Sequence, residues 1–452
     1  MSFLITTYRS AMKFKNLLLP ANACLVLMFS IQGFTQSSGY VKQVITSNSG
    51  KFEYNPPYTD WVTLQSYNPQ KKHVTNFSTI YTQSSQSILI SGHVGFFAAQ
   101  DSIVKYDLNT FERMAAIADT GLNRMAMYKG RLLVSKQYPV TQNFLEVLDT
   151  SNLGVIAQVS GISGDCGGIC SFNDTVYIAV NGGYMGTEGK LAIVDPASWT
   201  LKTEVNFGHQ AVGIMELYLS DGRIFSVNKT PYGVVDTGSV TVYTPPNRSY
   251  KNIFLPAIVG AGSGVKDSLL YLGINYGIGS FNLNTLAIAD TSIVKDPGSA
   301  VFTYIISSAV DTLDGRIYSN IGDYVTPGHC LVTSLKGDSI DTYPTGISSD
   351  AIAVDTRFYG AGIRDISGQD ISINLFPNPV QDRLKISFSR NISLESLIVT
   401  DASGREIIKI KPGVSSGTDY EIPVITLTPG IYYLLIGTTE GQVVKSFAVI
   451  AR

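Results

Sequence analysis

The chain has 452 residues, and its 33 Lys+Arg against 35 Asp+Glu give a formal net charge of −2. This balance excludes the basic footprint of a nucleic-acid-binding protein. A hydrophobic content of 44% excludes a largely disordered chain, and four cysteines exclude a disulfide scaffold. Only 15% of the residues are charged, while Gly (42) and Tyr (25) are frequent. This composition favours a β protein with uncharged surfaces.

Residues 1–36 have the pattern of a secretory signal peptide. Lys13 and Lys15 precede an apolar run from Leu17 to Phe29, and a polar stretch follows. Met12 is an alternative start, because residues 1–11 add nothing that such a signal needs. The apolar run is too short to cross a bilayer, and no other segment of 18 apolar residues exists. We therefore expect no transmembrane span in the mature chain.

A hairpin pattern recurs at intervals of about 40–48 residues, the period of propeller blades. Each copy has a short apolar strand, a tight polar turn and a strand of alternating large residues. Turns rich in Gly, Asn and Asp supply the positive φ that tight hairpins need. The predicted turns are Gly92-His93, Lys129-Gly130, Asn173-Asp174, Asp221-Gly222, Lys266-Asp267, Asp314-Gly315 and Asp355-Thr356.

A third strand follows most of these hairpins and ends in a similar phrase, such as VKYDLNT or LEVLDTS. The last hairpin, within residues 350–362, lacks this continuation. Residues 61–74 have the third-strand phrase but no hairpin before it. Joining the two completes a blade and removes open sheet edges. The sequence therefore predicts an all-β fold, a seven-bladed β-propeller over residues 47–365 closed by both chain ends. The alternatives are a large sandwich or six blades.

After a linker at 366–372, residues 373–452 predict a small antiparallel β-sandwich, with alternating strands between Pro, Gly and Asn turns. Its ordered motifs include Pro377, Asn378, Pro379, Asp382, Gly404, Pro429, Gly430, Tyr432 and Lys445. At these positions the segment resembles the type A C-terminal sorting domain of the type IX secretion system of Bacteroidota. The resemblance implies export by that machinery to the outer cell surface or the medium, usually with removal of the domain. An adhesive or carbohydrate-binding sandwich is the alternative.

Motifs that carry chemistry are scarce. No phosphate loop, nucleophile elbow, HExxH or calcium-loop pattern occurs, and the four histidines are far apart in sequence. Cys166 and Cys170 are candidates for a small-loop disulfide in an exported protein, and two buried thiols are the alternative. The spacing is weak evidence for zinc. We therefore predict neither a metal site nor a cofactor.

Tyrosines recur in the loops that join second to third strands. In a propeller these loops share one face with the loops that lead into each first strand. Each Tyr offers an apolar ring and a polar tip, which suits a flat or amphipathic ligand. The alternative is that the tyrosines only cover the blade interfaces. The candidate residues are Tyr138, Tyr184, Tyr232, Tyr276 and Tyr324, with Asn123, Arg124, Asp165, His209, Gln210, Tyr304 and Asp350 from the loops that lead into first strands.

The pattern of short apolar strands and polar turns in the predicted blades resembles that of the YncE-like surface propellers of Bacteroidota. An example is the segment SSQSILISGHVGFFAAQDSIVKYDLNT. Some of those relatives capture cobalamin at the outer membrane, although they are typically lipid-anchored, whereas we expect this chain to use the sorting domain instead. Our interpretation is an exported, non-enzymatic propeller that binds a small molecule, a glycan or a surface protein through its Tyr-rich face. The alternatives are corrinoid capture, an extracellular polysaccharide lyase or hydrolase, a quinone-type oxidoreductase, and a structural adhesin.

Overall fold

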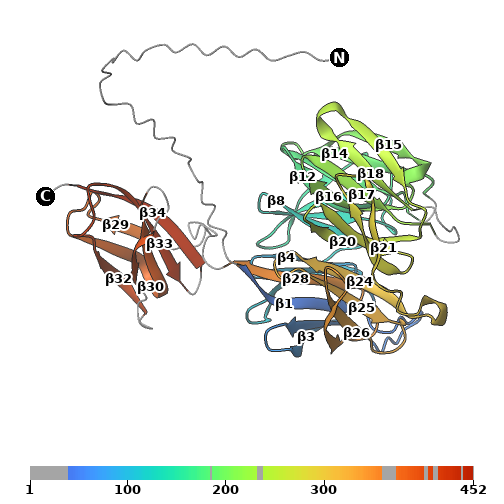
Figure 1. The fold of residues 1–452 in the computed structure, drawn as a ribbon, viewed down its shortest axis with the longest axis horizontal. Coiled ribbons are helices and arrows are strands. Elements are labelled where there is room, and N and C mark those ends of the chain that lie inside the picture. Colours follow the sequence, from blue (N-terminus) through green and yellow to red (C-terminus); the bar gives the residue numbers. More distant parts are fainter. Residues whose placement is uncertain are drawn as a thin grey trace, which may run out of the picture. The chain divides into compact units, whose positions relative to one another are not determined.

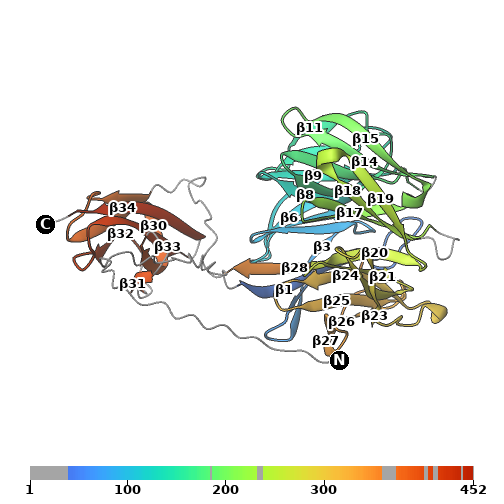
Figure 2. The same ribbon diagram turned by 45° about the horizontal axis from the view of Figure 1, so that its top comes forward.

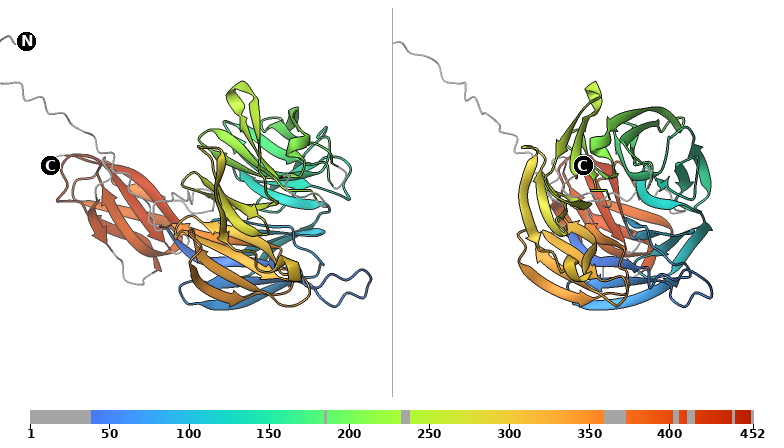
Figure 3. Two further views of the ribbon diagram at one scale, coloured as in Figure 1. Left: turned by 45° about the vertical axis from the view of Figure 1, so that its right-hand side comes forward. Right: turned by 90° about the vertical axis from the view of Figure 1, so that its right-hand side faces the viewer.

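The computed structural model describes residues 39–183, 186–231, 238–358, 373–401, 406–410, 416–438 and 441–450. The predicted signal peptide lies outside these residues. Within the described chain, residues 39–358 form seven four-stranded antiparallel sheets, which are the blades of a β-propeller (Figure 1). A view along the propeller shows the blades arranged in a ring (Figure 3, right). The predicted all-β, seven-bladed fold is confirmed.

The blades are named A to G, and their strands are given from the centre outward. Blade A contains β28 (Ala351–Phe358), β1 (Gly39–Asn48), β2 (Val62–Asn68) and β3 (His73–Ile80). Blade B contains β4 (Ser87–Ser91), β5 (Val94–Ala99), β6 (Ser102–Asp107) and β7 (Arg113–Ala118). Blade C contains β8 (Leu122–Tyr128), β9 (Arg131–Lys136), β10 (Leu145–Asp149) and β11 (Val155–Val159). Blade D contains β12 (Cys166–Phe172), β13 (Thr175–Val180), β14 (Gly189–Asp195) and β15 (Thr200–Gly208).

Blade E contains β16 (Ile214–Ser220), β17 (Arg223–Asn228), β18 (Ser239–Thr244) and β19 (Ser249–Phe254). Blade F contains β20 (Val259–Lys266), β21 (Leu269–Ile274), β22 (Gly277–Asn282) and β23 (Ala287–Val294). Blade G contains β24 (Tyr304–Asp311), β25 (Arg316–Gly322), β26 (His329–Ser334) and β27 (Ser339–Pro344). Three short 3₁₀ helices lie between strands: η1 (His209–Ala211), η2 (Pro245–Asn247) and η3 (Ser299–Val301).

The first strands of neighbouring blades contact each other around the whole ring, in the order β4, β8, β12, β16, β20, β24, β28 and back to β4. A separate buried hydrophobic cluster fills each interface between neighbouring blades. Each blade thus buries both of its faces, which explains why the middle strands are continuous apolar runs such as VGFFAA and TVYIAV.

The hairpin turns follow the predicted turn chemistry closely. Lys129-Gly130, Asn173-Asp174 and Asp221-Gly222 lie between first and second strands, and both residues of each pair have positive φ. Gly92-His93 also separates β4 from β5. The turn predicted at Lys266-Asp267 is displaced by one residue, because β20 includes Lys266 and the positive-φ pair is Asp267-Ser268. Asp314-Gly315 ends a longer loop between β24 and β25.

The hairpin predicted at Asp355-Thr356 is wrong. These residues lie inside β28, a single strand that pairs antiparallel with β1 from Gly39↔Phe358 to Ser47↔Ala351. The second strand of blade A therefore comes from the N-terminal part of the chain, and only the first comes from the C-terminal part (Figure 2). Closure by both chain ends is correct, but the N-terminal part supplies three strands rather than two.

Asp355 is part of the closure and does not form a turn. Its side chain is fully buried and accepts a hydrogen bond of 2.8 Å from Nε2 of Gln43 on β1 and one of 2.7 Å from Nη2 of Arg357. Gln43 also donates to the carbonyl of Leu108 in blade B, at 2.8 Å. On the other side of blade A, the rings of Tyr67 and Tyr343 stack with centroids 3.8 Å apart. The closing blade is thus joined to both of its neighbours.

The C-terminal residues form a separate β-sheet domain with strands β29 (Ile373–Phe376), β30 (Arg383–Thr400), β31 (Glu406–Ile410), β32 (Ser416–Pro423), β33 (Gly430–Thr438) and β34 (Gly441–Val449). The long strand β30 pairs with β29 and β32 in its first part and with β31 and β33 in its second part. One buried hydrophobic cluster contains side chains from both parts of β30 and from the strands that pair with it.

Asp355→Ala tests the closure. The change leaves the donors of Gln43 and Arg357 without their buried acceptor, and we expect a loss of about 3 kcal/mol in the free energy of unfolding. The control is Asp314→Ala, which removes the partly exposed ion pair with Arg316 and is expected to cost less than about 1 kcal/mol. Urea unfolding measures both changes. Equal losses would show that the buried carboxylate does not hold the ring closed.

Candidate functional site

One face of the propeller carries the loops that join second to third strands and the loops that lead into first strands. It is called the loop face here. The alternation of strand direction within each blade brings these two sets of loops to the same end. This arrangement was expected from the sequence. Four loops on neighbouring blades F, G and A carry most of the exposed aromatic side chains of this face.

Tyr276, Tyr304 and Tyr324 form a contiguous row, called the tyrosine row. The ring centroids of Tyr276 and Tyr304 are 6.4 Å apart, and those of Tyr304 and Tyr324 are 6.2 Å apart. Neighbouring rings are tilted by 54° and 44° to each other, so the three rings do not lie in one plane. The structure thus brings together three of the predicted residues from blades F and G.

The row is exposed and lies beside other apolar side chains. Tyr276 and Tyr324 are 47% and 46% exposed. Val301 and Phe302, in and just after η3, are 74% and 73% exposed and belong to the loop that leads into Tyr304. These two residues were not predicted. The row therefore lies within an apolar stretch that water covers in the free protein.

Three of these aromatic residues have a backbone conformation that residues with bulky side chains rarely adopt. Tyr276, Phe302 and Tyr324 have φ of 66°, 63° and 63°. Glycine adopts this region without strain, whereas a bulky residue there is uncommon. Leu153 has a similar φ of 62°, but its side chain is fully buried, so packing offsets the cost. The exposed aromatic residues have no comparable compensation, which is the pattern of a strained functional position.

A second aromatic group lies on the loop between β1 and β2. Phe52, Tyr54 and Tyr58 on this loop are 57%, 87% and 38% exposed, and Tyr81, before β4, is 76% exposed. Trp61 contacts both Tyr58 and Tyr81 edge-to-face, with centroids 6.0 and 5.6 Å apart. The loop extends from the ring at the right of Figure 3, left.

The loop is braced by polar contacts. The carboxylate of Glu53 accepts hydrogen bonds from the backbone and the hydroxyl of Thr59, at 2.5 and 2.6 Å. Asp60 accepts one of 2.8 Å from the backbone of Lys51. This group was not predicted from the sequence, because β1 was not recognised as a strand and residues 49–61 were therefore not recognised as a loop between two strands of one blade. The aromatic density of KFEYNPPYTDW was the available signal.

Asp350 lies beside the tyrosine row, at the start of β28. Its carboxylate accepts a hydrogen bond from the hydroxyl of Ser49, which also accepts one of 2.9 Å from the backbone of Ser85. Burial raises the pKa of Asp350 to about 6, and the Ser49 hydrogen bond opposes this shift. Burial, followed by the charge of Asp350, raises the pKa of Tyr324. The carboxylate therefore acts electrostatically on the nearest ring of the row.

Arg124 reaches across the centre of the ring. Its Nη2 lies 3.3 Å from Oε1 of Glu216 on β16, two blades away. Its Nη1 donates to the carbonyl of Gln86, at 3.0 Å. The pairing was not predicted, because nothing in the sequence links Glu216 to Arg124. The charge of Arg124 is thus matched within the described chain.

The span between β8 and β16 depends on two glycines in β12. A Cβ at Gly167 would lie 2.6 Å from the carbonyl of Met215, and one at Gly168 would lie 2.8 Å from the backbone nitrogen of Leu217. Only glycine allows the first strands of blades D and E to approach this closely.

Other predicted residues have structural contacts. Asn123 is buried and its amide donates to the carbonyl of Cys166, at 2.7 Å. Asp165 accepts a hydrogen bond of 3.1 Å from the backbone of Tyr138, which is 81% exposed on blade C. No aromatic contact joins Tyr138 to the row among the described residues. Asp165 therefore positions the loop that presents Tyr138.

The remaining predicted positions divide into two groups. His209 and Gln210 are exposed in η1, and the carbonyl of Gln210 accepts a hydrogen bond from Ser239. Tyr184 and Tyr232 lie outside the described residues. Their contribution to the loop face stays a prediction.

The disulfide considered for Cys166 and Cys170 is not formed, because both thiols are free. Cys166 belongs to the hydrophobic cluster between blades C and D, whereas Cys170 packs against the cluster between blades D and E. The two side chains thus lie on opposite faces of the same sheet. Burial raises the pKa of Cys170 to about 12, so neither this thiol nor the fully buried Cys166 is poised to react.

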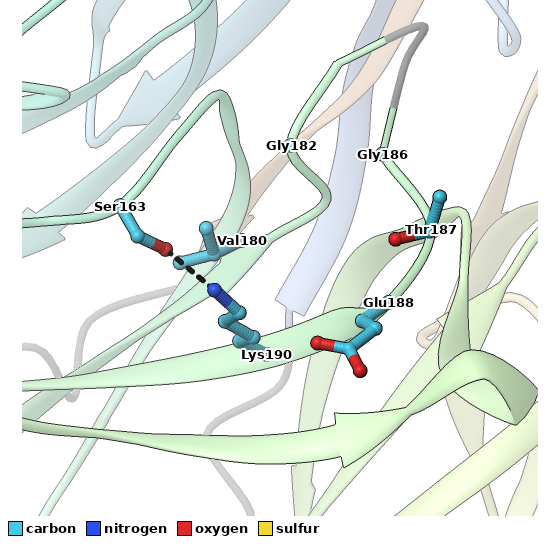
Figure 4. A pocket seen from close by; sticks show the side chains of 7 residues that line it. All are labelled: Ser163, Val180, Gly182, Gly186, Thr187, Glu188 and Lys190. Carbon is cyan, nitrogen blue, oxygen red and sulfur yellow. Dashed lines mark hydrogen bonds between the residues drawn. The ribbon is translucent and has the colours of Figure 1, made fainter.

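A cavity of about 180 Å³ lies on blade D, between the loop before β12 and the loop between β13 and β14 (Figure 4). Nζ of Lys190 donates to the hydroxyl of Ser163 there, at 3.1 Å, and Glu188 also lines the cavity. Pockets for organic ligands usually measure roughly 300–1,000 Å³. This cavity is smaller, and it contains none of the described aromatic residues of the loop face.

In the C-terminal domain, the side chains of the sorting motif support the sheet. Oδ1 of Asn378 accepts a hydrogen bond of 2.9 Å from the backbone of Ala448 on β34. The hydroxyl of Tyr432 donates to the carbonyl of Thr428, at 2.8 Å. Pro377, Pro379 and Asp382 lie between β29 and β30, Pro429 and Gly430 at the start of β33, and Lys445 on β34. Gly404 lies outside the described residues.

Among the described residues, no helix is long and apolar enough to cross a membrane. The described ranges also contain no group of three or more His, Cys, Asp and Glu side chains placed to hold a metal ion.

Residues 374–450 match the family of secretion system C-terminal sorting domains. No curated protein matches the chain. A selenium-binding protein from Sulfolobus tokodaii has a similar structure, with 10% sequence identity, a TM-score of 0.53, and coverage of 70% of this chain and 93% of that one.

Two further solved structures are similar at lower scores. The WD40 repeats of RRP9 share 12% identity, with a TM-score of 0.47 and coverage of 59% of this chain and 83% of theirs. Hydrazine synthase of Kuenenia stuttgartiensis shares 11% identity, with a TM-score of 0.47 and coverage of 67% and 95%. The selenium-binding protein supports the propeller fold alone. The protein is therefore a secreted or outer-surface β-propeller protein with a type IX secretion sorting domain.

Asp350→Asn tests the burial of this carboxylate. The folded-state pKa of about 6 lies above the ordinary value of 3.8, so the folded protein binds the proton more tightly than the unfolded chain. The native protein should lose stability as the pH rises from about 4 to 6, by up to about 3 kcal/mol, and Asn should remove this loss. Tyr324, the titratable neighbour, stays protonated throughout this range. Thermal unfolding at pH 4 to 8 measures the difference, and a constant difference would contradict the expectation.

A double-mutant cycle tests the span across the ring. Arg124→Met and Glu216→Gln each leave a partly buried partner unmatched, and the double variant should lose less stability than the sum of the two. We expect a coupling of roughly 1–3 kcal/mol by urea unfolding. The exposed pair Lys129 and Asp174 is the control, and its coupling is expected to be much weaker because both side chains stay in water. Similar couplings in both cycles would mean that the central pair has no special role.

Proposed function

We propose that this secreted propeller is a non-enzymatic binding protein, and that the aromatic side of its loop face contacts the ligand or partner. The observation that carries the proposal is the tyrosine row with Phe302, because exposed aromatic residues occupy backbone positions that glycine would occupy without strain. Aromatic side chains that combine an apolar ring with a polar tip are frequent at binding surfaces.

The arrangement of the residues supports a surface site. The row and the aromatic loop between β1 and β2 come from the adjoining blades F, G and A. The backbone of Ser49 donates to the carbonyl of Ser348, at 2.8 Å, which joins that loop to the segment carrying Asp350. The aromatic groups are therefore held by the ring rather than by long free loops, which lowers the entropy lost on binding.

The residues of this surface do not by themselves identify the ligand. The resemblance to YncE-like propellers and corrinoid capture remain predictions, as does catalysis by an extracellular enzyme. Each implies a different ligand chemistry, so one screen with cobalamin, oligosaccharides and divalent metal ions distinguishes them. A thermal shift caused by binding rises with ligand concentration above the dissociation constant.

Tyr276→Gly and Tyr324→Gly test the proposal on any ligand that shifts the melting temperature. Glycine relieves the positive φ, so we expect the free variants to fold with stability changes within about 1 kcal/mol of the native protein. The ligand-induced shift should disappear. Tyr250→Ala, a tyrosine of similar exposure on β19, should keep the shift. A shift that survives in both glycine variants would place binding elsewhere and contradict the proposal.

A further inference from the structure

We propose that the tyrosine row together with Asp350 binds an organic cation, a substituted ammonium group whose carbon substituents contact the rings. This inference rests on the proposed function and specifies the class of ligand. Three features of the site support it: the spacing of the rings, the charge beside them, and the backbone conformation of the residues that present them.

The ring spacing suits a compact cation. Ammonium groups are attracted to the face of an aromatic ring when they lie within about 6 Å of its centroid. Neighbouring centroids in the row are 6.4 and 6.2 Å apart, and the rings are tilted by 54° and 44°. A single cation above the gap between two neighbouring rings therefore lies within about 6 Å of both centroids. The rings do not lie in one plane, so they offer no continuous flat surface for stacking.

The charge beside the row is negative and is not matched by a cation in the described chain. Asp350 accepts its hydrogen bond from the neutral hydroxyl of Ser49, and none of the described lysines or arginines forms an ion pair with it. Arg124, the cation at the centre of the ring, is already paired with Glu216. A cationic ligand would meet a carboxylate that acts on Tyr324, whereas a neutral or anionic ligand would leave that charge uncompensated.

The residues that present the site are held in place before a ligand arrives. Tyr276 and Tyr324 have positive φ in short loops that follow β21 and β25, and Tyr304 is the first residue of β24. Asp323 fixes the start of the last loop by accepting hydrogen bonds from the backbones of Val325 and Thr326, at 2.9 and 2.7 Å. A cation would thus find the rings and the carboxylate already near their bound positions.

Choline and its neutral isostere 3,3-dimethylbutan-1-ol test the charge requirement on the full chain. Isothermal titration calorimetry at pH 7.5 should show choline binding about ten-fold or more tightly than the alcohol, because the two differ only in charge at nearly the same shape. Equal affinity for the two compounds, or no choline binding, would overturn the proposal.

Variants then assign the site. Asp350→Asn and Tyr324→Leu should each weaken choline binding about ten-fold or more, while Tyr324→Phe should keep most of it because the ring remains. Tyr138→Leu, on the same face but outside the row, should have no effect. Asp350→Asn is expected to fold at least as stably as the native protein at this pH, so its loss of binding cannot be assigned to unfolding. Unchanged choline affinity in Asp350→Asn would overturn the role of the carboxylate.

The outcome also separates this inference from the proposed function. If choline does not bind, but the row variants abolish the thermal shift of a neutral ligand, the cation is the wrong class and the binding face is correct. If the row variants alter the binding of no ligand that shifts the native protein, both proposals fail.

Discussion

The structure depends on one antiparallel pairing, that of β28 with β1. Every other blade is built from consecutive strands, whereas blade A needs strands separated by more than three hundred residues. This pairing closes the ring of first strands and leaves no open edge at the seam. The buried carboxylate of Asp355 connects β28 to Gln43, and Gln43 connects β1 to blade B. Because the two strands lie far apart in sequence, their pairing carries a larger loop-closure entropy cost than the pairing of consecutive strands within a blade.

The candidate site exists only in the closed ring. Tyr276 comes from blade F, Tyr304 and Tyr324 come from blade G, and Asp350 starts the strand that closes blade A. Arg124 and Glu216 span two blades across the centre. No blade alone carries the row with its carboxylate. Stability of the closure and the chemistry of the loop face are therefore coupled through β28.

Local chemistry made much of this fold predictable. Pairs such as Asn173-Asp174 and Asp221-Gly222 tolerate positive φ, so the hairpins could be located from the sequence. Asp355-Thr356 resembles such a pair, but pairing with β1 keeps it extended. The loop positions of Tyr276 and Tyr324 followed from the repeat. Three features could not be predicted, because they depend on which blades are neighbours and local sequence patterns do not contain that information. These are the contact of both tyrosines with Tyr304, the pairing of Arg124 with Glu216, and the aromatic loop after β1.

The pairing of Gly39 with Phe358 has a consequence for how the protein is held. β1 runs from Gly39 toward the loop that carries Tyr54, and β28 runs from Ala351, just after Asp350, toward Phe358. The chain thus enters and leaves the propeller at neighbouring points on the side remote from the tyrosine row. A tether attached through either terminus would therefore join the propeller at the end opposite its aromatic surface and would leave that surface uncovered.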